Sequence, residues 1–117
     1  MVKLLSYDEA KDVVLNYKQK EKIQVLCVIN MESGCRICKE LTQNIDNPLS
    51  ILEREGFIDL NVIDSEEAYG FFKPPTMFMM YYYIPWNEKH TPQIRDHLQP
   101  VDELRKDIRY WIINKKG

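Results

Sequence analysis

The sequence predicts an α/β domain built on a partly parallel sheet. Its 117 residues, of which 44% are hydrophobic, suffice for one domain with an ordinary core. Segments with strand and helix periodicity alternate along the chain, and no linker, internal repeat or low-complexity segment separates them. Strands that alternate with helices favour parallel pairs joined by right-handed crossovers. We therefore expect a single layered domain over residues 1–117.

The first segments predict a helix followed by a buried strand. Ser6 and Glu9 have the spacing of a capping box, which marks a helix start. The apolar face of this helix contains Ala10, Val13, Val14 and Tyr17. The polar residues 18–22 end it. Residues 23–31 are almost continuously apolar and rich in β-branched side chains, which is typical of a central strand covered on both faces.

The period changes to that of a helix at Cys35. One face of this second helix holds Cys38, Leu41, Thr42 and Ile45, and the opposite face holds Lys39, Glu40 and Gln43. Asn47-Pro48 interrupts it, because proline disfavours the helical state in the residue before it. A short helical turn is expected over 49–55, with Gly56 as its C-terminal cap.

The second half of the chain predicts three strands and a final helix. Residues 57–63 alternate apolar and polar, and residues 64–70 are expected to form a loop with a short helix. The strongly β-prone residues 76–84 follow a stiff turn, and residues 93–99 are a weaker strand after a loop over 85–92. The last helix is expected over 100–115. Its apolar stripe contains Val101, Leu104, Ile108, Trp111 and Ile112.

Composition excludes several classes of function. The 16 basic and 18 acidic residues nearly balance, so no field favours nucleic acid or an anionic membrane. No apolar run approaches the roughly 20 residues of a membrane span, and residues 1–7 do not resemble a signal peptide. Three cysteines argue against a structural disulfide framework and favour a reducing compartment. We expect a cytoplasmic, monomeric protein.

A C-x-x-C motif, Cys35-Arg36-Ile37-Cys38, stands where the buried strand turns into a helix. At a helix start Cys35 faces unbonded backbone N–H groups and the positive end of the dipole, both of which favour the reactive thiolate. Arg36 and Lys39 add positive charge. Cys38 follows one turn later, closer to the core. The pair therefore divides into an attacking thiol and a resolving thiol.

Two other interpretations of the motif remain open. The two cysteines are packing residues in one, and half of a zinc site in the other. A zinc site needs two further ligands, but the chain has no second C-x-x-C, and His90 and His97 are seven residues apart rather than the roughly three to five of zinc fingers.

Over nearly its whole length the chain resembles the thioredoxin superfamily. The resemblance is carried by the strand over 23–31, the run from Ser33 to Lys39 around the C-x-x-C, and Pro75-Thr76 forty residues after Cys35. It implies a thioredoxin-like three-layer fold with a central mixed sheet of four to five strands flanked by helices. It also implies a thiol–disulfide oxidoreductase that needs no cofactor. Its partners would be protein disulfides or small thiols and an electron donor.

The resemblance also implies roles for single residues. Cys35 is the nucleophile and Cys38 the resolving thiol. Pro75 follows a cis peptide bond, shapes the substrate groove and keeps metal ions away from the thiols; a trans double-proline turn is the alternative. The remaining site residues, which tune the thiolate or line the groove, are Gly34, Arg36, Ile37, Pro74 and Thr76.

The sequence departs from the family pattern at three places. Ser33-Gly34 replaces the usual tryptophan before the motif. Ile29 occupies the position of a buried acid that assists the resolving thiol, so resolution is expected to be slow, and Glu32 is a poor substitute if exposed. Pro74 has no backbone N–H to pair with a substrate. The missing acid and Pro74 favour a second hypothesis, a thioredoxin-fold adaptor that binds a partner through the loop over 85–92 or an aromatic surface.

The remaining reactive or aromatic side chains are expected to be structural. We expect Cys27 to be a buried free thiol in mid-strand. The three tyrosines 81–83 should alternate between the two sides of their strand. Both histidines are expected at the surface, and the methionines 77, 79 and 80 in the core.

Overall fold

The computed structural model describes residues 4–30, 36–43, 46–68, 78–89 and 91–113, with the backbone alone at 36–38 and 65. Its elements in chain order are α1 (Tyr7–Asn16), the 3-10 turn η1 (Tyr17–Gln19), β1 (Ile23–Ile29), α2 (Arg36–Gln43), α3 (Pro48–Arg54), β2 (Ile58–Asp64), α4 (Ser65–Ala68), β3 (Phe78–Tyr83), β4 (Gln93–Arg95) and α5 (Val101–Ile113). The radius of gyration, 13.5 Å, is that of a compact chain of this length.

The four strands form one mixed sheet in the order β2-β1-β3-β4. β1 pairs with β2 in parallel and with β3 in antiparallel orientation, and β3 pairs antiparallel with β4. Leu4, which belongs to no strand, forms an isolated parallel bridge to Val62 of β2, and the N–H of Leu5 donates to the Val62 carbonyl at 2.7 Å. The predicted α/β class with a partly parallel sheet is confirmed.

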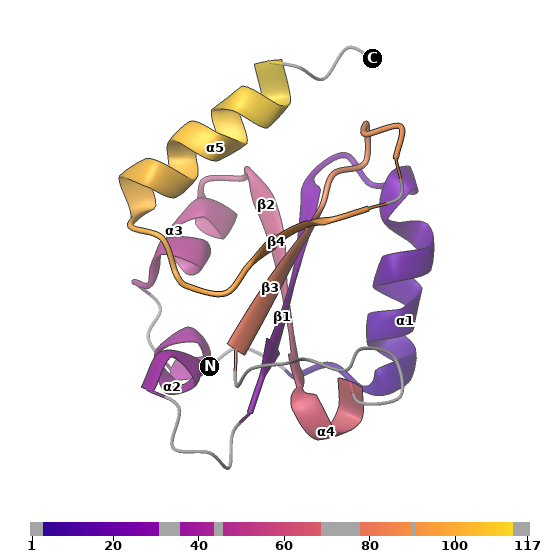
Figure 1. Ribbon diagram of the computed structural model, residues 1–117, viewed down its shortest axis with the longest axis vertical. Helices are drawn as coiled ribbons and strands as arrows, with labels where there is room; N and C mark the ends of the chain where they lie inside the picture. The colour runs from indigo at the N-terminus through magenta and orange to yellow at the C-terminus, as the bar shows by residue number, and fades with distance from the viewer. Residues whose placement is uncertain (1–3, 31–35, 44–45, 69–77, 90, 114–117) are drawn as a thin grey trace.

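Helices cover both sides of the sheet (Figure 1). The helices α2, α3 and α5 lie on one side, and α1 and α4 lie on the other. All seven residues of β1 are buried, as expected for a central strand covered on both faces. Their side chains alternate: Val25 and Cys27 join the core under α3 and α5, whereas Leu26 and Val28 join the core under α1 and α4.

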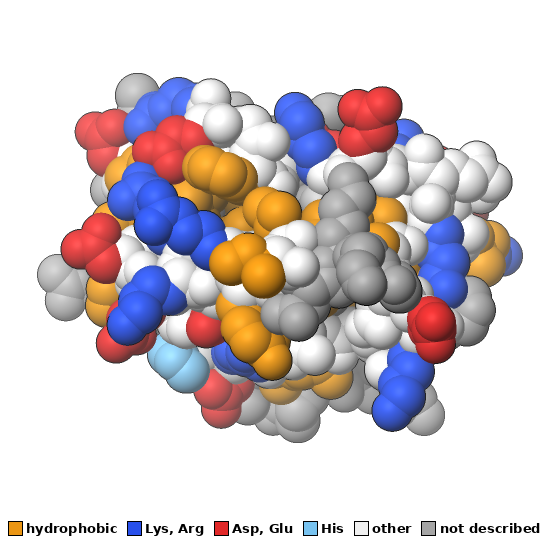
Figure 2. Space-filling model, turned by 90° about the horizontal axis from the view of Figure 1, so that it is seen from above, with side chains coloured by type: hydrophobic (Ala, Val, Ile, Leu, Met, Phe, Trp, Pro, Cys, Tyr) orange, Lys and Arg blue, Asp and Glu red, His pale blue; other side chains and the backbone are white. Residues whose placement is uncertain are grey.

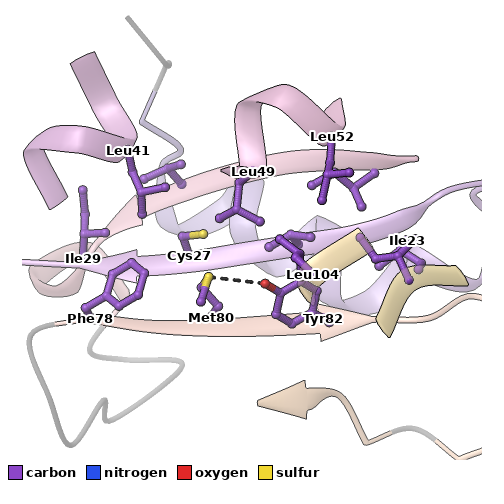
Figure 3. Close-up of a cluster of buried hydrophobic side chains, with 14 of the residues drawn as sticks. Ile23, Cys27, Ile29, Leu41, Leu49, Leu52, Phe78, Met80, Tyr82 and Leu104 are labelled. Carbon is purple, nitrogen blue, oxygen red and sulfur yellow. Dashed lines mark hydrogen bonds between the residues drawn. The ribbon is translucent and has the colours of Figure 1, made fainter. Parts of the chain in front are cut away.

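The core under α2, α3 and α5 is the larger of the two (Figure 3). Leu41 of α2, Leu49 of α3 and Leu104 of α5 reach the sheet there, each fully buried. In β3, Met80 and Tyr82 belong to this core, and the Tyr82 hydroxyl donates to the Met80 sulfur at 3.4 Å. The opposite core receives Met79, Tyr81 and Tyr83. The predicted alternation of the tyrosines is confirmed, and so is the core position of Met79 and Met80; Met77 lies outside the described residues.

Local signals in the sequence set the helix boundaries. The Ser6 side chain accepts from the N–H of Glu9 at 3.2 Å, and the Glu9 carboxylate accepts from the N–H of Ser6 at 3.0 Å, which is the predicted capping box. At the end of α3, Gly56 has φ +86°, and its N–H donates to the Glu53 carbonyl at 3.0 Å. This is the predicted glycine cap.

Two boundaries and the burial of one residue differ from the prediction. Asn47-Pro48 starts α3 instead of merely ending α2: the Asn47 side chain caps the helix, and Pro48 occupies the first turn, where its missing N–H has no consequence. β4 stops at Arg95, before the chain bends to α5, where the Gln99 amide donates to Asp107 at 3.0 Å. Ile112 is 37% exposed, because the last turn of α5 extends past the sheet.

Among the described residues, no helix combines the length and the apolar character that crossing a bilayer requires.

Candidate functional site

The two segments that carry the predicted site begin at the same end of the sheet. Ile29, the last residue of β1, pairs with Asp64 of β2 and with Phe78 of β3. The C-x-x-C lies on the segment that follows β1, and Pro74 to Thr76 lies on the segment that leads into β3. The carboxyl ends of parallel strands are where open α/β sheets bind ligands. The topology therefore joins both segments to the sheet at the same edge: one leaves β1 there, and the other enters β3 there.

Several predicted site residues lie outside the described residues. These are Gly34, Cys35, Pro74, Pro75 and Thr76, so the Cys35–Cys38 pair and the Pro74–Pro75 peptide bond are not described. Arg36, Ile37 and Cys38 form the first turn of the α2 backbone. The described part of α2 thus starts at Arg36, the residue after Cys35.

The faces of α2 agree with the predicted pattern. Leu41 and Thr42 are buried, whereas Lys39 and Gln43 are exposed. The side chains of Cys38 and Ile45, the other two residues of the predicted apolar face, lie outside the described part of the structure. The backbone N–H groups of the first turn have no partner within the helix. An anion next to this turn is therefore stabilised by the helix dipole.

Asn47 links α2 to α3. Its side-chain amide, 1% exposed, donates to the Glu40 carbonyl at 3.3 Å and to the Ser50 hydroxyl at 3.0 Å, and its oxygen accepts from the Ser50 N–H at 3.0 Å. One side chain thus holds the end of α2 and the start of α3. Sequence analysis found only an interruption here. An asparagine before a proline is itself the signal for a capped helix start.

The apolar position before the motif is confirmed. Ile29 is 0% exposed and belongs to the core under α2, so no carboxylate occupies this place. Asp64 ends the neighbouring strand and is half-buried. Asp64 lies two residues after Val62 in β2, so the two residues share one face of the sheet. Val62 belongs to the core under α2, which makes this the face that α2 covers. Its carboxylate accepts from the Glu66 N–H at 3.0 Å. Sequence analysis assigned Asp64 only to the start of a loop.

Cys27 is a buried thiol in the middle of β1. It is 0% exposed, and burial raises the pKa of its thiol far above the ordinary value. Its cross-strand neighbours are Val62 and Met80, both apolar. The thiol therefore stays protonated and unreactive in the folded protein, as the sequence predicts.

The described histidine is a surface residue, as expected. His97 lies 3.1 Å from Asp96, and the hydrogen bond between their side chains lowers the pKa of the Asp96 carboxyl. His90 lies outside the described residues. Within the described part, no three His, Cys, Asp or Glu side chains are grouped to hold a metal ion.

Comparison of the sequence with protein-family models and with curated proteins found no match.

Proposed function

We propose that the chain is a thioredoxin-like thiol–disulfide oxidoreductase whose reactive groups are Cys35 and Cys38. The observation that carries the proposal is the place of the C-x-x-C. The motif lies in the sequence between the fully buried β1, which ends at Ile29, and α2, whose first described residues are Arg36 to Cys38. The three layers, the mixed sheet and the terminal helix α5 agree with such a fold. The resemblance adds the segment with Pro74, Pro75 and Thr76, which enters β3 beside the end of β1.

The proposed reaction is a two-step exchange. The Cys35 thiolate attacks one sulfur of a substrate disulfide, a Cys35–substrate S–S bond forms, and the second substrate sulfur leaves as a thiolate. The Cys38 thiolate then attacks the Cys35 sulfur. A Cys35–Cys38 disulfide forms and the first substrate sulfur is released. The substrate gains two electrons and two protons, and the protein is oxidised. An external dithiol donor returns the protein to its reduced form.

The surroundings of α2 support different roles for the two thiols. Positive charge from Arg36 and Lys39 and the start of a helix favour the Cys35 thiolate. Cys38 follows three residues later in the sequence, further from the start of the helix, so the helix dipole favours its thiolate less. We propose that the Asp64 carboxylate accepts the proton of the Cys38 thiol, directly or through water, since the Ile29 side chain cannot accept a proton.

A redox titration tests this function. The protein is equilibrated across reduced and oxidised dithiothreitol, alkylated, and its free thiols are counted by mass. We expect a reversible loss of two thiols that disappears in Cys35→Ser and in Cys38→Ser and remains in Cys27→Ala. A potential near or below about −200 mV indicates a reductant, and one near about −120 mV an oxidant. Absence of any reversible transition would exclude the proposed chemistry.

The second candidate function is an adaptor that uses the same fold without redox chemistry. The packing of the loop after β3 favours it, because Trp86 is held against α5 by a hydrogen bond to the Trp111 carbonyl at 2.9 Å. A complex that survives the combined Cys35→Ser and Cys38→Ser substitutions, in a protein without a redox transition, distinguishes this function from the first.

A further inference from the structure

A second surface with a specific composition lies at the opposite end of the sheet from the C-x-x-C. Tyr83, the last residue of β3, pairs with Gln24 near the start of β1. The loop that follows Tyr83 is therefore separated from the end of β1 by the length of the strand, roughly 20 Å. This end of the molecule is the one seen in Figure 2, where apolar side chains gather among charged ones.

Two tryptophans are fixed in position at this end. The Trp86 indole N–H donates to the Trp111 carbonyl at 2.9 Å. The Trp111 ring packs against Tyr82 with 5.5 Å between centroids, and the Arg95 guanidinium lies 5.9 Å from the Trp111 ring. Lys18 donates to the Glu88 carbonyl at 3.4 Å, which attaches the loop to the turn after α1. These side chains are already ordered by the fold, so a ligand need not order them.

Two hollows share Trp86 as a wall. The first, of about 330 Å³, lies between Trp86 and Trp111 and is floored by Ile84. The second, of about 720 Å³, runs from Trp86 along the lysines of the α1–β1 turn. The first has the size of a site for one or two apolar side chains, and the second is open and charged. The two hollows share Trp86 and are together called the groove below; its apolar walls are those of Ile84, Trp86 and Trp111 in the first hollow.

The charge of the groove is opposite to that of the chain. Its charged side chains are Lys18, Lys20, Lys22, Lys89, Glu21 and Glu88, a net charge of +2 against −2 for the whole sequence. Within the described residues none of these four lysines forms an ion pair. Their charge therefore remains available to an incoming group. Charge complementarity of this kind selects an anionic partner.

We propose that this groove binds an acidic polypeptide segment. An apolar side chain of the segment enters the hollow between Trp86 and Trp111, and its carboxylates lie along the lysines at 18, 20 and 22. In protein interfaces a few side chains contribute most of the affinity. They are typically anchors that fill a pocket and are surrounded by polar contacts. A polypeptide fits better than a nucleic acid, because two glutamates lie among the lysines and Ile84 floors the pocket. The site is independent of the redox chemistry, since Tyr83 pairs near the start of β1 whereas the segment with the C-x-x-C follows the end of β1.

Fluorescence anisotropy with a labelled nonapeptide, Asp-Glu-Asp-Leu-Phe-Glu-Asp-Glu-Asp, tests the proposal on the full chain. We expect saturable binding that weakens with added salt. Replacing Leu and Phe by Gly, or every acidic residue by Ser, should each weaken it about tenfold. In the protein, Lys20→Glu with Lys22→Glu should weaken it about tenfold, and these exposed substitutions leave the core intact. Trp86→Ala should weaken binding to the acidic peptide but leave circular dichroism unchanged.

The matched control is Lys11→Glu with Lys106→Glu, an equal change of charge at exposed positions outside the groove. This control should bind as the natural chain does, and so should the Cys35→Ser, Cys38→Ser protein. Equal weakening by both lysine pairs would overturn the proposal, as would absence of saturable binding. Tighter binding of a labelled oligothymidylate would assign the groove to nucleic acid instead. A dimer by sedimentation that Lys20→Glu with Lys22→Glu dissociates would assign it to a second copy.

Discussion

The indole N–H of Trp86 donates a hydrogen bond to the backbone carbonyl of Trp111. The last carbonyls of a helix have no partner within it. Trp111 stands two residues before Ile113, the last described residue of α5, so Trp86 supplies a donor to a carbonyl in the last described turn. The bond joins the loop after β3 to the terminal helix. It explains why a loop with prolines at both ends presents a fixed surface.

Trp86→Phe should destabilise the protein by about 1 kcal/mol, because it removes this donor and keeps most of the ring packing. For a chain of this size the loss corresponds to a few degrees in the thermal midpoint, roughly 4 °C or more. Calorimetry of the natural chain and the variant measures it. A variant as stable as the natural chain would mean that water replaces the bond without loss.

Gly56→Ala should destabilise the protein by about 1 kcal/mol, because a side chain at φ +86° is strained. No atom lies within 4 Å of the position that a Cβ would take, so the loss comes from the backbone alone. Gly56→Asn is the matched control, since asparagine tolerates this conformation better. Urea unfolding should rank the stabilities as Gly, then Asn, then Ala. Equal stability of the Asn and Ala variants would contradict the backbone origin.

Asn47→Ala should destabilise the protein by about 2 kcal/mol. It removes the cap of α3 and the part-buried hydrogen bond that the Asn47 amide donates to the Glu40 carbonyl. Asn47→Ser keeps a capping oxygen and should recover part of the loss. Urea unfolding of the three proteins measures both effects. If the Ser variant were no more stable than the Ala variant, the link to α2 and not the cap would dominate.

Stability should fall at alkaline pH because of Cys27. Its pKa is raised in the folded state, so the stabilisation is complete below the unfolded pKa of about 8.5 and declines as pH rises above it. In a Cys35→Ser, Cys38→Ser background, the free energy of unfolding should drop by about 1.4 kcal/mol per pH unit above pH 9. Adding Cys27→Ala should abolish the slope below about pH 10. Burial also raises the pKa of Tyr82 and Tyr83, so a second decline should begin there.

Asp64→Asn should slow release of product from the Cys35 mixed disulfide near neutral pH, by about tenfold or more. The difference should shrink as pH approaches the pKa of the Cys38 thiol, where a base is no longer needed. Stopped-flow measurement of the released thiol against pH tests this. Asp8→Asn, an exposed control, should leave the profile unchanged. A rate reduced equally at every pH would indicate that Asp64 acts only through α4.

The periodic elements could be predicted from the sequence because buried positions carry apolar residues, and these recur with the period of a helix or a strand. The strand over 23–29 and the helix from Val101 are examples, and so are the cap residues Ser6 and Gly56. The end of β4 could not be predicted, because it depends on contacts made across the fold, such as that of Gln99 with Asp107.

The candidate site was predictable only in part. The alternation of strand and helix patterns correctly predicted the buried strand that ends at Ile29 and the helix that contains Cys38. The position of Asp64 depends on the parallel register of β1 and β2, which a single sequence does not encode locally. Asn47 illustrates another limit: one side chain bonded to two helices has no periodic signature.

The contrast between β1 and β4 has a consequence for hydrogen exchange. Every residue of β1 is buried and the strand has a neighbour along both edges, whereas β4 has three residues and pairs with β3 alone among the described strands. Amide protons of β1 should exchange with solvent only when the whole molecule unfolds, and those of β4 by local opening. We therefore expect β1 to unfold as one cooperative unit along its whole length. The loop around Trp86 adjoins the least protected strand.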